Sequence, residues 1–388
     1  MNFNFSKTQQ DLYELVGYLA REHFAPRAEE SDRLKALPLD NLRDLHKHGL
    51  LGLTIAREHG GLGSGVMGED PLLYLLAIEQ TARLDLSTAH CLHIHLHATH
   101  FIDQVATAEQ RKTLLGPVLE RGALIGAVGS EPGRTARGVY MLNTTAQEFP
   151  KGIMLNGRKN YATLAGVAEY MIVFATLKEA KPMEGHIGVA VPQGAKGYEV
   201  VQDSWDPIGM RSAVSPDVVL DNCMVPSSMI IGSPGVYPND RWQARHYLSL
   251  AAQYLGASEG LFDSLTEYIP VRGTAGEQFT QLRLGEIRVL IDSMRWLIYR
   301  SAWLWNQGDL QQAELFAMVA RQHATRTVVD IMDKSAQIAG SHALTGTGKF
   351  QRMMRDLRIH TLHSNVDKTA ATIGKYHLGQ NFDITDRL

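Results

Sequence analysis

The chain has 388 residues, of which 44% are hydrophobic and 20% charged, and its formal net charge is −3. A chain of this length can bury a large core, which favours two or three structural units. The charge balance leaves no basic surface for nucleic acid, and no apolar run approaches the roughly 20 residues of a membrane helix. We therefore expect a cytoplasmic protein without nucleic-acid or membrane partners. Cys91 and Cys223 lie far apart and are expected to be buried thiols.

Three textures follow one another along the chain. In residues 1–122 apolar side chains recur every three or four positions, as in "TQQDLYELVGYLAREHF", which predicts an N-terminal α-helical domain. Residues 123–235 contain short β-rich runs such as "AEYMIVFATL" and "HIGVAVP" between turn residues, which predicts a central β-barrel or β-sandwich domain. Residues 236–388 return to long helical patterns with short loops, typical of a C-terminal four-helix bundle. The expected fold class is α+β, mostly α.

Two glycine patterns resemble functional motifs but lack the context that those motifs need. Residues 63–68 fit a dinucleotide-binding fingerprint, yet no clean strand precedes them. Residues 256–260 fit the Gly-x-Ser-x-Gly pattern of hydrolases, but they fall inside a predicted helix, where small residues allow close helix packing. No nicotinamide-binding unit is therefore expected in this chain.

Five histidines, His90, His93, His95, His97 and His100, occur in the stretch "HCLHIHLHATH". On a helix, His93, His97 and His100 share one face, a spacing that could ligate a metal. The stretch contains no carboxylate, and another segment would have to supply a fourth ligand, so we predict no metal site. The remaining alternatives are helix packing without a function, and one or two imidazoles that line a pocket as proton donors or acceptors.

Three separated stretches, taken together, resemble the acyl-CoA dehydrogenase superfamily. They are "VGSEPGR" at 128–134, "LNGRKNYATLAGVAEYMIVFA" at 155–175, and the segments from "IGMRSAVSPDVVLDNCMV" to "QIAGSHALTGTGKFQRMMRDLRIH". The resemblance covers nearly the whole chain. It implies the fold of that family, with helical, β and helical domains in this order, and a homotetramer or homodimer in which a neighbouring chain helps to hold the cofactor.

The same resemblance implies a flavin and a set of residues that bind it. FAD is expected, with FMN as the alternative. By their positions in the family's motifs, the implied cofactor-binding residues are Val128, Gly129, Ser130, Tyr161, Thr163, Arg272, Gln337 and Gly340. The chain departs from the desulfurising members of the family at Ala162 and Leu164, where those members tend to have serine and glycine. This departure puts a sulfur substrate in doubt.

A second departure concerns the catalytic base. In many acyl-CoA dehydrogenases a glutamate follows the Arg-Asp pair of the last helices and removes the α-proton of a thioester, but here Ser364 aligns with it. Glu259 is a possible relocated base. Arg355 and Asp356 are expected to form a structural ion pair within the bundle.

The stretch "RIHTLHSNVDKT" instead resembles the flavin monooxygenase branch of the superfamily, which includes dibenzothiophene and alkylsulfur monooxygenases. The resemblance implies an oxygenase in which a reduced-flavin/O2 adduct oxidises a sulfur, nitrogen or aromatic carbon centre of a small organic substrate, with a separate flavin reductase as partner. A role in secondary metabolism or sulfur assimilation is plausible by resemblance. His360 and His363 are expected at the flavin edge, with His93 or His97 opposite. The alternatives are a helix-capping role for one histidine, an acyl-CoA dehydrogenase or oxidase, and a non-catalytic flavin-binding subunit.

Overall fold

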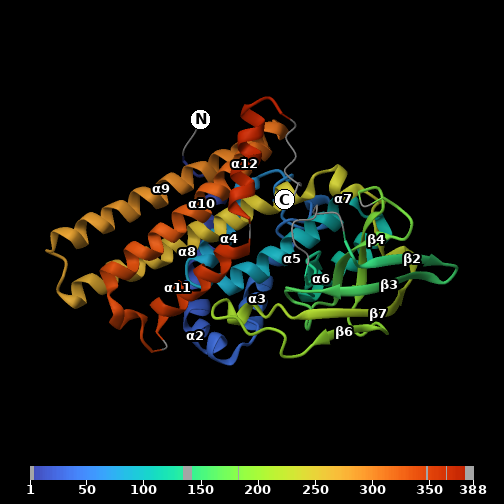
Figure 1. The fold of residues 1–388 in the computed structure, drawn as a ribbon, viewed down its shortest axis with the longest axis horizontal. Coiled ribbons are helices and arrows are strands. Elements are labelled where there is room, and N and C mark those ends of the chain that lie inside the picture. The colour runs from blue at the N-terminus through green and yellow to red at the C-terminus, as the bar shows by residue number, and fades with distance from the viewer. Residues whose placement is uncertain (1–3, 134–141, 182, 347, 364, 381–388) are drawn as a thin grey trace.

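The computed structural model describes residues 4–133, 142–181, 183–346, 348–363 and 365–380 (Figure 1). Helices occupy this part of the chain as far as Arg121, strands follow from Ile125 to Ile231, and helices return from Val236. Figure 1 shows the sheet at the right and the long C-terminal helices at the left. The predicted fold class, α+β and mostly α, is confirmed.

In the described part of the chain, six α-helices precede the sheet: α1 (Lys7–Leu19), α2 (Ala25–Leu34), α3 (Leu39–Lys47), α4 (Pro71–Ala82), α5 (Leu86–Val105) and α6 (Ala108–Arg121). The Asp85 side chain accepts a hydrogen bond from the Thr88 backbone N–H and so caps the start of α5. Helix α5 is buried along nearly its whole length, and all five of its histidines are buried. It packs against β1 on one side and α8 on another, so its imidazoles face the interior of the protein.

The sheet contains eight strands: β1 (Ile125–Val128), β2 (Thr145–Phe149), β3 (Gly152–Lys159), β4 (Tyr170–Leu177), β5 (His186–Pro192), β6 (Tyr198–Val201), β7 (Asp217–Val225) and β8 (Ile230–Ile231). Their order is β6-β7-β3-β2-β4-β5-β8, and β1 pairs in parallel with β4. Strands β4 and β5 are buried along most of their length, which explains their continuous apolar sequences. The turns after β1 and β3 become part of the site described below.

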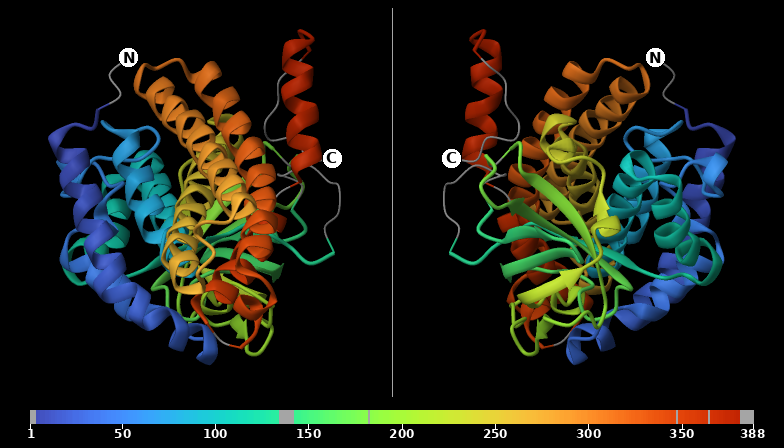
Figure 2. Two further views of the ribbon diagram at one scale, coloured as in Figure 1. Left: turned by 90° about the vertical axis from the view of Figure 1, so that its left-hand side faces the viewer. Right: turned by 90° about the vertical axis from the view of Figure 1, so that its right-hand side faces the viewer.

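The C-terminal part consists of the short helix α7 (Val236–Asn239) and the helices α8 (Trp242–Arg272), α9 (Gln278–Asn306), α10 (Leu310–Ala339), α11 (Lys349–His360) and α12 (Val366–His377). Helices α8, α9 and α10 pack along one another, and α11 contacts α8. Figure 2 shows α12 projecting from one side of this bundle, where it packs against α10.

The two glycine patterns have structural roles. Residues 63–68 lie in the loop before α4, whereas Gly256 and Gly260 lie inside α8 at its contact with α4. A Cβ atom on Gly256 would lie 2.0 Å from the carbonyl oxygen of Glu79, and one on Gly260 would lie 1.6 Å from that of Arg83. The prediction that small residues at 256–260 allow close helix packing is therefore confirmed.

The predicted ion pair between Arg355 and Asp356 is wrong. The Arg355 guanidinium lies 2.7 Å from Asp32 on α2, and Asp356 lies 3.4 Å from Arg352 one turn earlier on α11. Neighbouring residues of a helix do not face each other, whereas residues four apart do. Each of the two side chains therefore pairs with a different partner.

Both cysteines carry buried free thiols, as expected. In the part of the chain that the structure describes, no helix combines the length and the apolar character that crossing a membrane requires.

Candidate active site

Two turns at the carboxyl ends of strands β1 and β3 lie side by side. One follows β1, whose last residue is the predicted cofactor position Val128, and contains Gly129 and Ser130, and the other follows β3. The backbone N–H of Asn160 donates a hydrogen bond over 3.1 Å to the carbonyl oxygen of Ser130. The fold therefore brings together the two segments that the sequence suggested separately.

A buried ion pair fixes the first turn. Lys159 Nζ lies 2.9 Å from Glu131 Oε1, and both side chains are almost completely buried. Burial by itself would raise the pKa of Glu131, but Lys159 and the backbone N–H of Asn143 lower it below its ordinary value. Removing one partner of such a pair costs about 3–5 kcal/mol, because a buried charge is left unpaired.

Tyr161 and Thr163 occupy the second turn in different ways. Tyr161 has a positive φ of 55°, its side chain is 64% exposed, and its ring meets that of Trp205 edge-on. Thr163 is buried, and its hydroxyl lies 2.8 Å from the Ser215 hydroxyl and 3.3 Å from His90 Nε2. Thr163 therefore connects the turn to the histidine-rich helix α5.

Three imidazoles from distant parts of the chain meet beside Thr163. His90 lies on α5, His360 ends α11, and His363 ends the short 3-10 turn Thr361–His363. The ring centre of His90 is 5.4 Å from that of His360 and 5.8 Å from that of His363. His360 is buried and His363 is exposed. Sequence reasoning selected His360 and His363 but not His90, although His90 lies only one helical turn from His93.

His93 connects this group to α8. Its Nε2 lies 2.9 Å from His246 Nδ1, and its Nδ1 lies 2.7 Å from the Ser249 hydroxyl and 3.0 Å from the Tyr74 hydroxyl. The His246 ring centre is 6.0 Å from that of His363. Sequence reasoning missed His246, because a single histidine near the start of a long helix carries no local signal.

His97 lies one turn further along α5. Its Nε2 is 3.2 Å from the Tyr237 hydroxyl, and its ring centre is 5.2 Å from that of His246 and 6.2 Å from that of His93. His100, the third residue of the spacing considered for a metal, has Nδ1 at 3.2 Å from the carbonyl oxygen of Thr54. Among the described residues, no three or more His, Cys, Asp and Glu side chains are arranged to hold a metal ion.

Burial keeps five of these imidazoles neutral at neutral pH, those of His90, His93, His97, His246 and His360. It lowers the pKa of His90 to about 4 and that of His97 to about 3. Burial, helped by neighbouring imidazoles, also lowers the pKa values of His93, His246 and His360 well below 6.5. In the ligand-free protein each ring therefore has one N–H donor and one lone pair, and none is a ready imidazolium acid.

Glu259, the possible relocated base, lies elsewhere and is paired. Its carboxylate is 2.8 Å from the Arg288 guanidinium and also bonds Arg295. Burial alone would raise the pKa of Glu259, but the two arginines lower it below its ordinary value. Glu259 follows His246 by thirteen residues, which is about 20 Å along α8. The structure therefore does not bring it to the imidazole group.

The remaining predicted cofactor residues lie at the far end of the bundle. Arg272 ends α8, and its guanidinium bonds the carbonyl oxygens of Ile338 and Ala339, directly beside Gly340. Gln337 lies at the same end and accepts a hydrogen bond from Arg283 over 2.8 Å. Along α8, Arg272 is about 39 Å from His246. Within this chain these residues are not brought together with the turns after β1 and β3.

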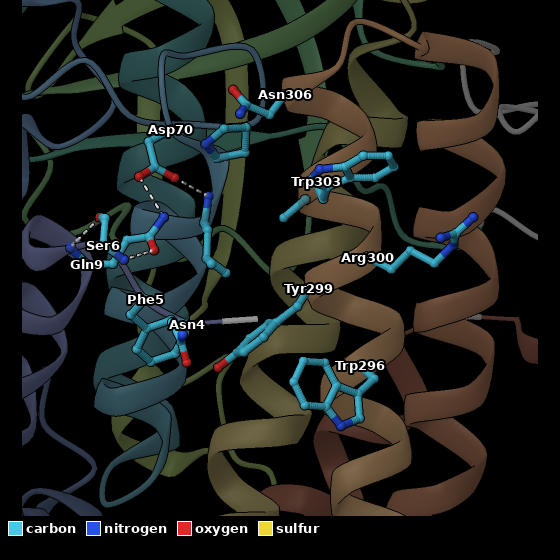
Figure 3. Close-up of a pocket in the computed structure, with 13 residues that line it drawn as sticks. Asn4, Phe5, Ser6, Gln9, Asp70, Trp296, Tyr299, Arg300, Trp303 and Asn306 are labelled. Atoms are coloured by element: carbon cyan, nitrogen blue, oxygen red, sulfur yellow. Dashed lines mark hydrogen bonds between the residues drawn. The ribbon is translucent and has the colours of Figure 1, made fainter. Parts of the chain in front are cut away.

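A cavity of about 420 Å³ lies outside the imidazole group (Figure 3). Its walls come from the start of α1, the start of α4 and the last turns of α9. They include Phe5, Asp70, Trp296, Tyr299 and Trp303. Figure 3 shows the aromatic side chains of α9 on one side of the cavity, and Asp70 with its hydrogen-bond partner Gln9 on another.

Comparison with known protein families matches three domains of one enzyme family. Residues 6–121 match the acyl-CoA dehydrogenase N-terminal domain, residues 126–223 its middle domain, and residues 245–364 its C-terminal domain.

Individual relatives extend over nearly the whole chain. The short-chain specific acyl-CoA dehydrogenase of Clostridium acetobutylicum is 26% identical over 376 residues, which cover 95% of this chain and 97% of that protein. Butyryl-CoA dehydrogenase from Megasphaera elsdenii superposes with a TM-score of 0.89 at 23% identity, covering 97% of this chain and 100% of that chain. FMN-bound TdsC, a dibenzothiophene monooxygenase from Paenibacillus sp. A11-2, superposes with a TM-score of 0.85 at 23% identity, covering 97% and 99%. At these identities the structural likenesses concern the fold.

Proposed function

The chain belongs to the acyl-CoA dehydrogenase family, a family of oxidoreductases, and we propose that it acts as a flavin-dependent oxygenase on a small organic substrate. The observation that carries this proposal is a site built from imidazoles, whereas desaturation of a thioester needs a carboxylate base. Within the described residues, no carboxylate is hydrogen bonded to His90, His93, His246 or His360. Ser364, which aligns with the family's glutamate, lies outside the described residues.

The two turns after β1 and β3 fit a flavin. The exposed ring of Tyr161 offers an aromatic face, and the hydroxyls of Ser130 and Thr163 offer hydrogen-bond partners for the edge of the flavin ring. His360 Nε2 is buried and has no hydrogen-bond partner among the described residues, which costs about 1–3 kcal/mol unless a ligand satisfies it. Bound in its reduced form, the flavin supplies two electrons to O2, so that one oxygen atom enters the substrate and the other leaves as water.

FAD rather than FMN is the proposed form, and a second subunit is proposed to complete its site. Arg272 resembles the pyrophosphate-binding arginine of this family, and Gln337 resembles the glutamine that is supplied across its subunit interface. Together with Gly340, the other predicted cofactor-binding residue of this region, they lie at the far end of the bundle. A neighbouring chain of a homotetramer or homodimer can deliver this end to the turns after β1 and β3. The partner surface is proposed to include α9, where large apolar side chains are exposed at helical spacing: Phe279, Leu282, Val289, Trp296 and Trp303.

A separate flavin reductase is the proposed source of reduced flavin. Residues 63–68, whose glycine spacing fits a dinucleotide-binding loop, lie between N-terminal helices rather than between a strand and a helix. Two alternative functions are each supported by a separate observation. The curated relative from Clostridium acetobutylicum favours an acyl-CoA dehydrogenase or oxidase, and the exposed α9 surface is also compatible with a non-catalytic flavin-binding subunit.

The test is stopped-flow absorbance of the flavin-loaded, anaerobically reduced protein mixed with O2 in the absence of substrate. We expect a transient whose spectrum differs from those of reduced and oxidised flavin. His363→Ala is expected to shorten its lifetime roughly 100-fold at unchanged flavin occupancy. His48→Ala, at an exposed position beyond α3, is the matched control.

Each rival predicts a different result. Direct return to oxidised flavin in the wild-type protein, together with bleaching of the oxidised flavin by butyryl-CoA, would favour the dehydrogenase or oxidase. Direct return without bleaching would favour the non-catalytic subunit. An unchanged transient in His363→Ala would remove His363 from the chemistry.

A further inference from the structure

The hydrogen bonds around His93 determine which of its ring nitrogens carries the hydrogen, and the first of them is a bond from Ser249 to the backbone. The Ser249 hydroxyl donates to the carbonyl oxygen of His246 over 3.1 Å. A hydroxyl has a single proton, so Ser249 is an acceptor toward His93 Nδ1, which lies 2.7 Å away. His93 Nδ1 therefore carries the hydrogen. The Tyr74 hydroxyl oxygen, 3.0 Å from the same nitrogen, is a second oxygen near this N–H.

The tautomer of His93 determines the tautomer of His246. A neutral imidazole has one N–H, so His93 Nε2 presents a lone pair to His246 Nδ1 at 2.9 Å. His246 Nδ1 must then be the donor of that bond, which leaves the lone pair of His246 on Nε2. Ser249, His93 and His246 thus form a chain that leaves the basic lone pair of His246 on Nε2, the nitrogen that does not face His93.

Burial identifies His246 as the end of this chain that a ligand can reach. His93, Ser249 and Tyr74 are buried, whereas His246 is partly exposed and lies beside the exposed His363. His93 contacts His246 directly over 2.9 Å, so His246 links the buried side chains to the more exposed part of the site.

A buried cation for which the described residues provide no ion pair, Arg321, lies near His246. Arg321 on α10 is only 5% exposed, and its guanidinium stacks on the Tyr247 ring at 3.8 Å. Its Nε has no hydrogen-bond partner among the described residues. Its charge is close enough to contribute to the lowered pKa of His246. A buried guanidinium stays charged and is stabilised by an anion, so this surrounding favours a ligand that becomes negatively charged.

We propose that His246 is the proton acceptor of the site, that His93 is its positioning residue, and that the substrate carries an acidic O–H or N–H group next to the reacting atom. The proposal rests on the proposed oxygenase function and narrows its substrate class. The proton leaves the substrate oxygen or nitrogen for His246 Nε2, the substrate becomes an anion near Arg321, and the resulting imidazolium keeps its second N–H on His93. The proton returns to solvent when the product leaves.

This assignment separates the substrate classes that the sequence left open. Oxidation of a thioether requires no deprotonation of the substrate, because its sulfur carries no proton. Ionising a phenol or an acidic N–H compound makes the neighbouring atoms electron-rich and therefore more reactive toward activated oxygen. The base His246 and the nearby cation Arg321 therefore favour a phenol or an acidic N–H compound over a thioether.

The first test measures the tautomers directly. Nitrogen NMR of the flavin-loaded, histidine-labelled protein, with His93→Gln and His246→Gln for assignment, is expected to find the hydrogen on Nδ1 of both rings. Ser249→Ala removes the acceptor and is expected to move the hydrogen of His93 to Nε2. Nε2–H tautomers in the wild-type protein, as would result if Tyr74 donated to His93, would overturn the proposal.

The second test uses 4-nitrophenol, whose ionised form has its own absorbance, at a pH below its solution pKa. The flavin-loaded wild-type protein is expected to bind it as the anion. His246→Gln and Ser249→Ala are each expected to retain binding but to raise the apparent pKa of the bound probe by about one unit, a roughly tenfold lower ionised fraction. His48→Gln is the control and should match the wild type.

Absence of binding, or an ionised fraction equal in wild type and His246→Gln, would overturn the assignment of substrate class and proton acceptor. Both tests are performed without O2, so their failure is distinct from failure of the oxygenase proposal.

Discussion

The two halves of α8 differ in their buried polar groups: one carries neutral imidazoles and the other carries a carboxylate paired with arginines. Near its start, His246 faces His93 and other imidazoles, and the nearby guanidinium of Arg321 has no acid partner among the described residues. Thirteen residues later, Glu259 is bound by two arginines, and the buried Glu79 is bonded by the Tyr299 hydroxyl over 2.9 Å. Ion-paired carboxylates of this kind hold α4, α8 and α9 together, whereas the imidazoles near the start of α8 are neutral and are hydrogen bonded to one another or to hydroxyl groups.

Acid should affect the buried imidazoles of α5, which faces the imidazole half of α8, more than the carboxylate half. The pKa values of His90, His95 and His100 are lowered to about 4 by burial, against about 6.5 in the unfolded chain. Between these values the unfolded state binds more protons, so the free energy of unfolding falls as pH falls from 6.5 to 4 and is fully recovered above 6.5. Each histidine contributes on the order of 3 kcal/mol to this change.

Urea unfolding across this pH range measures the effect. His95 is the best single probe, because its Nδ1 accepts from the Ile125 N–H over 3.0 Å and its Nε2 lies 3.1 Å from the carbonyl oxygen of Leu51. His95→Gln should flatten the pH dependence by about 3 kcal/mol. An unaltered slope would mean that this ring is not held neutral.

Arg295→Met tests the carboxylate half. Arg295 pairs with Glu259 and Asp292 and lies 3.7 Å from Glu79. Its removal should destabilise the protein by about 3–5 kcal/mol in denaturant unfolding, because buried carboxylates lose their main counter-charge. Arg326→Met, which removes an exposed pair with Asp367, is the control and should cost less than about 1 kcal/mol.

Glu259→Gln tests whether the carboxylate half of α8 takes part in the reaction. Arg288 and Arg295 both keep Asp292 as a partner, so we expect a loss of only about 1–2 kcal/mol in the free energy of unfolding. The reaction of the reduced, flavin-loaded variant with O2 should equal that of the wild type in stopped-flow absorbance. A lost or altered reaction would restore Glu259 as a candidate base.

Tyr254→Phe should have the smallest effect on stability. The Tyr254 hydroxyl donates to the carbonyl oxygen of His360 over 2.8 Å, and the two rings lie 5.0 Å apart. Thermal unfolding should report a loss of about 1 kcal/mol, the usual contribution of one hydrogen bond. A loss above about 3 kcal/mol would indicate that the bond anchors the end of α11 more strongly than we infer.

The sequence was informative where function depends on local pattern. The mostly helical fold followed from periodicity, and the turns at Ser130 and Tyr161 were recognisable as motifs. It was uninformative where function depends on which helices meet. His246 is recognised as a site residue only from the packing of α8 against α5, which brings it to His93. The partners of Arg355 and Asp356 come from α2 and from one turn earlier on α11. Periodicity specifies the buried face of a helix, but not the side chain opposite.

The contact of α8 with α4 at Gly256 and Gly260 has a consequence for anyone who redesigns this protein. A single added methyl group at Gly256 would meet the Glu79 carbonyl and displace α8. The displacement would reach His246, about 15 Å along the helix, and a hydrogen bond between two rings weakens once its length grows by a few tenths of an ångström. Two glycines without reactive side chains thus control how precisely His246 is held against His93, and a library aimed at new substrates should leave them unchanged.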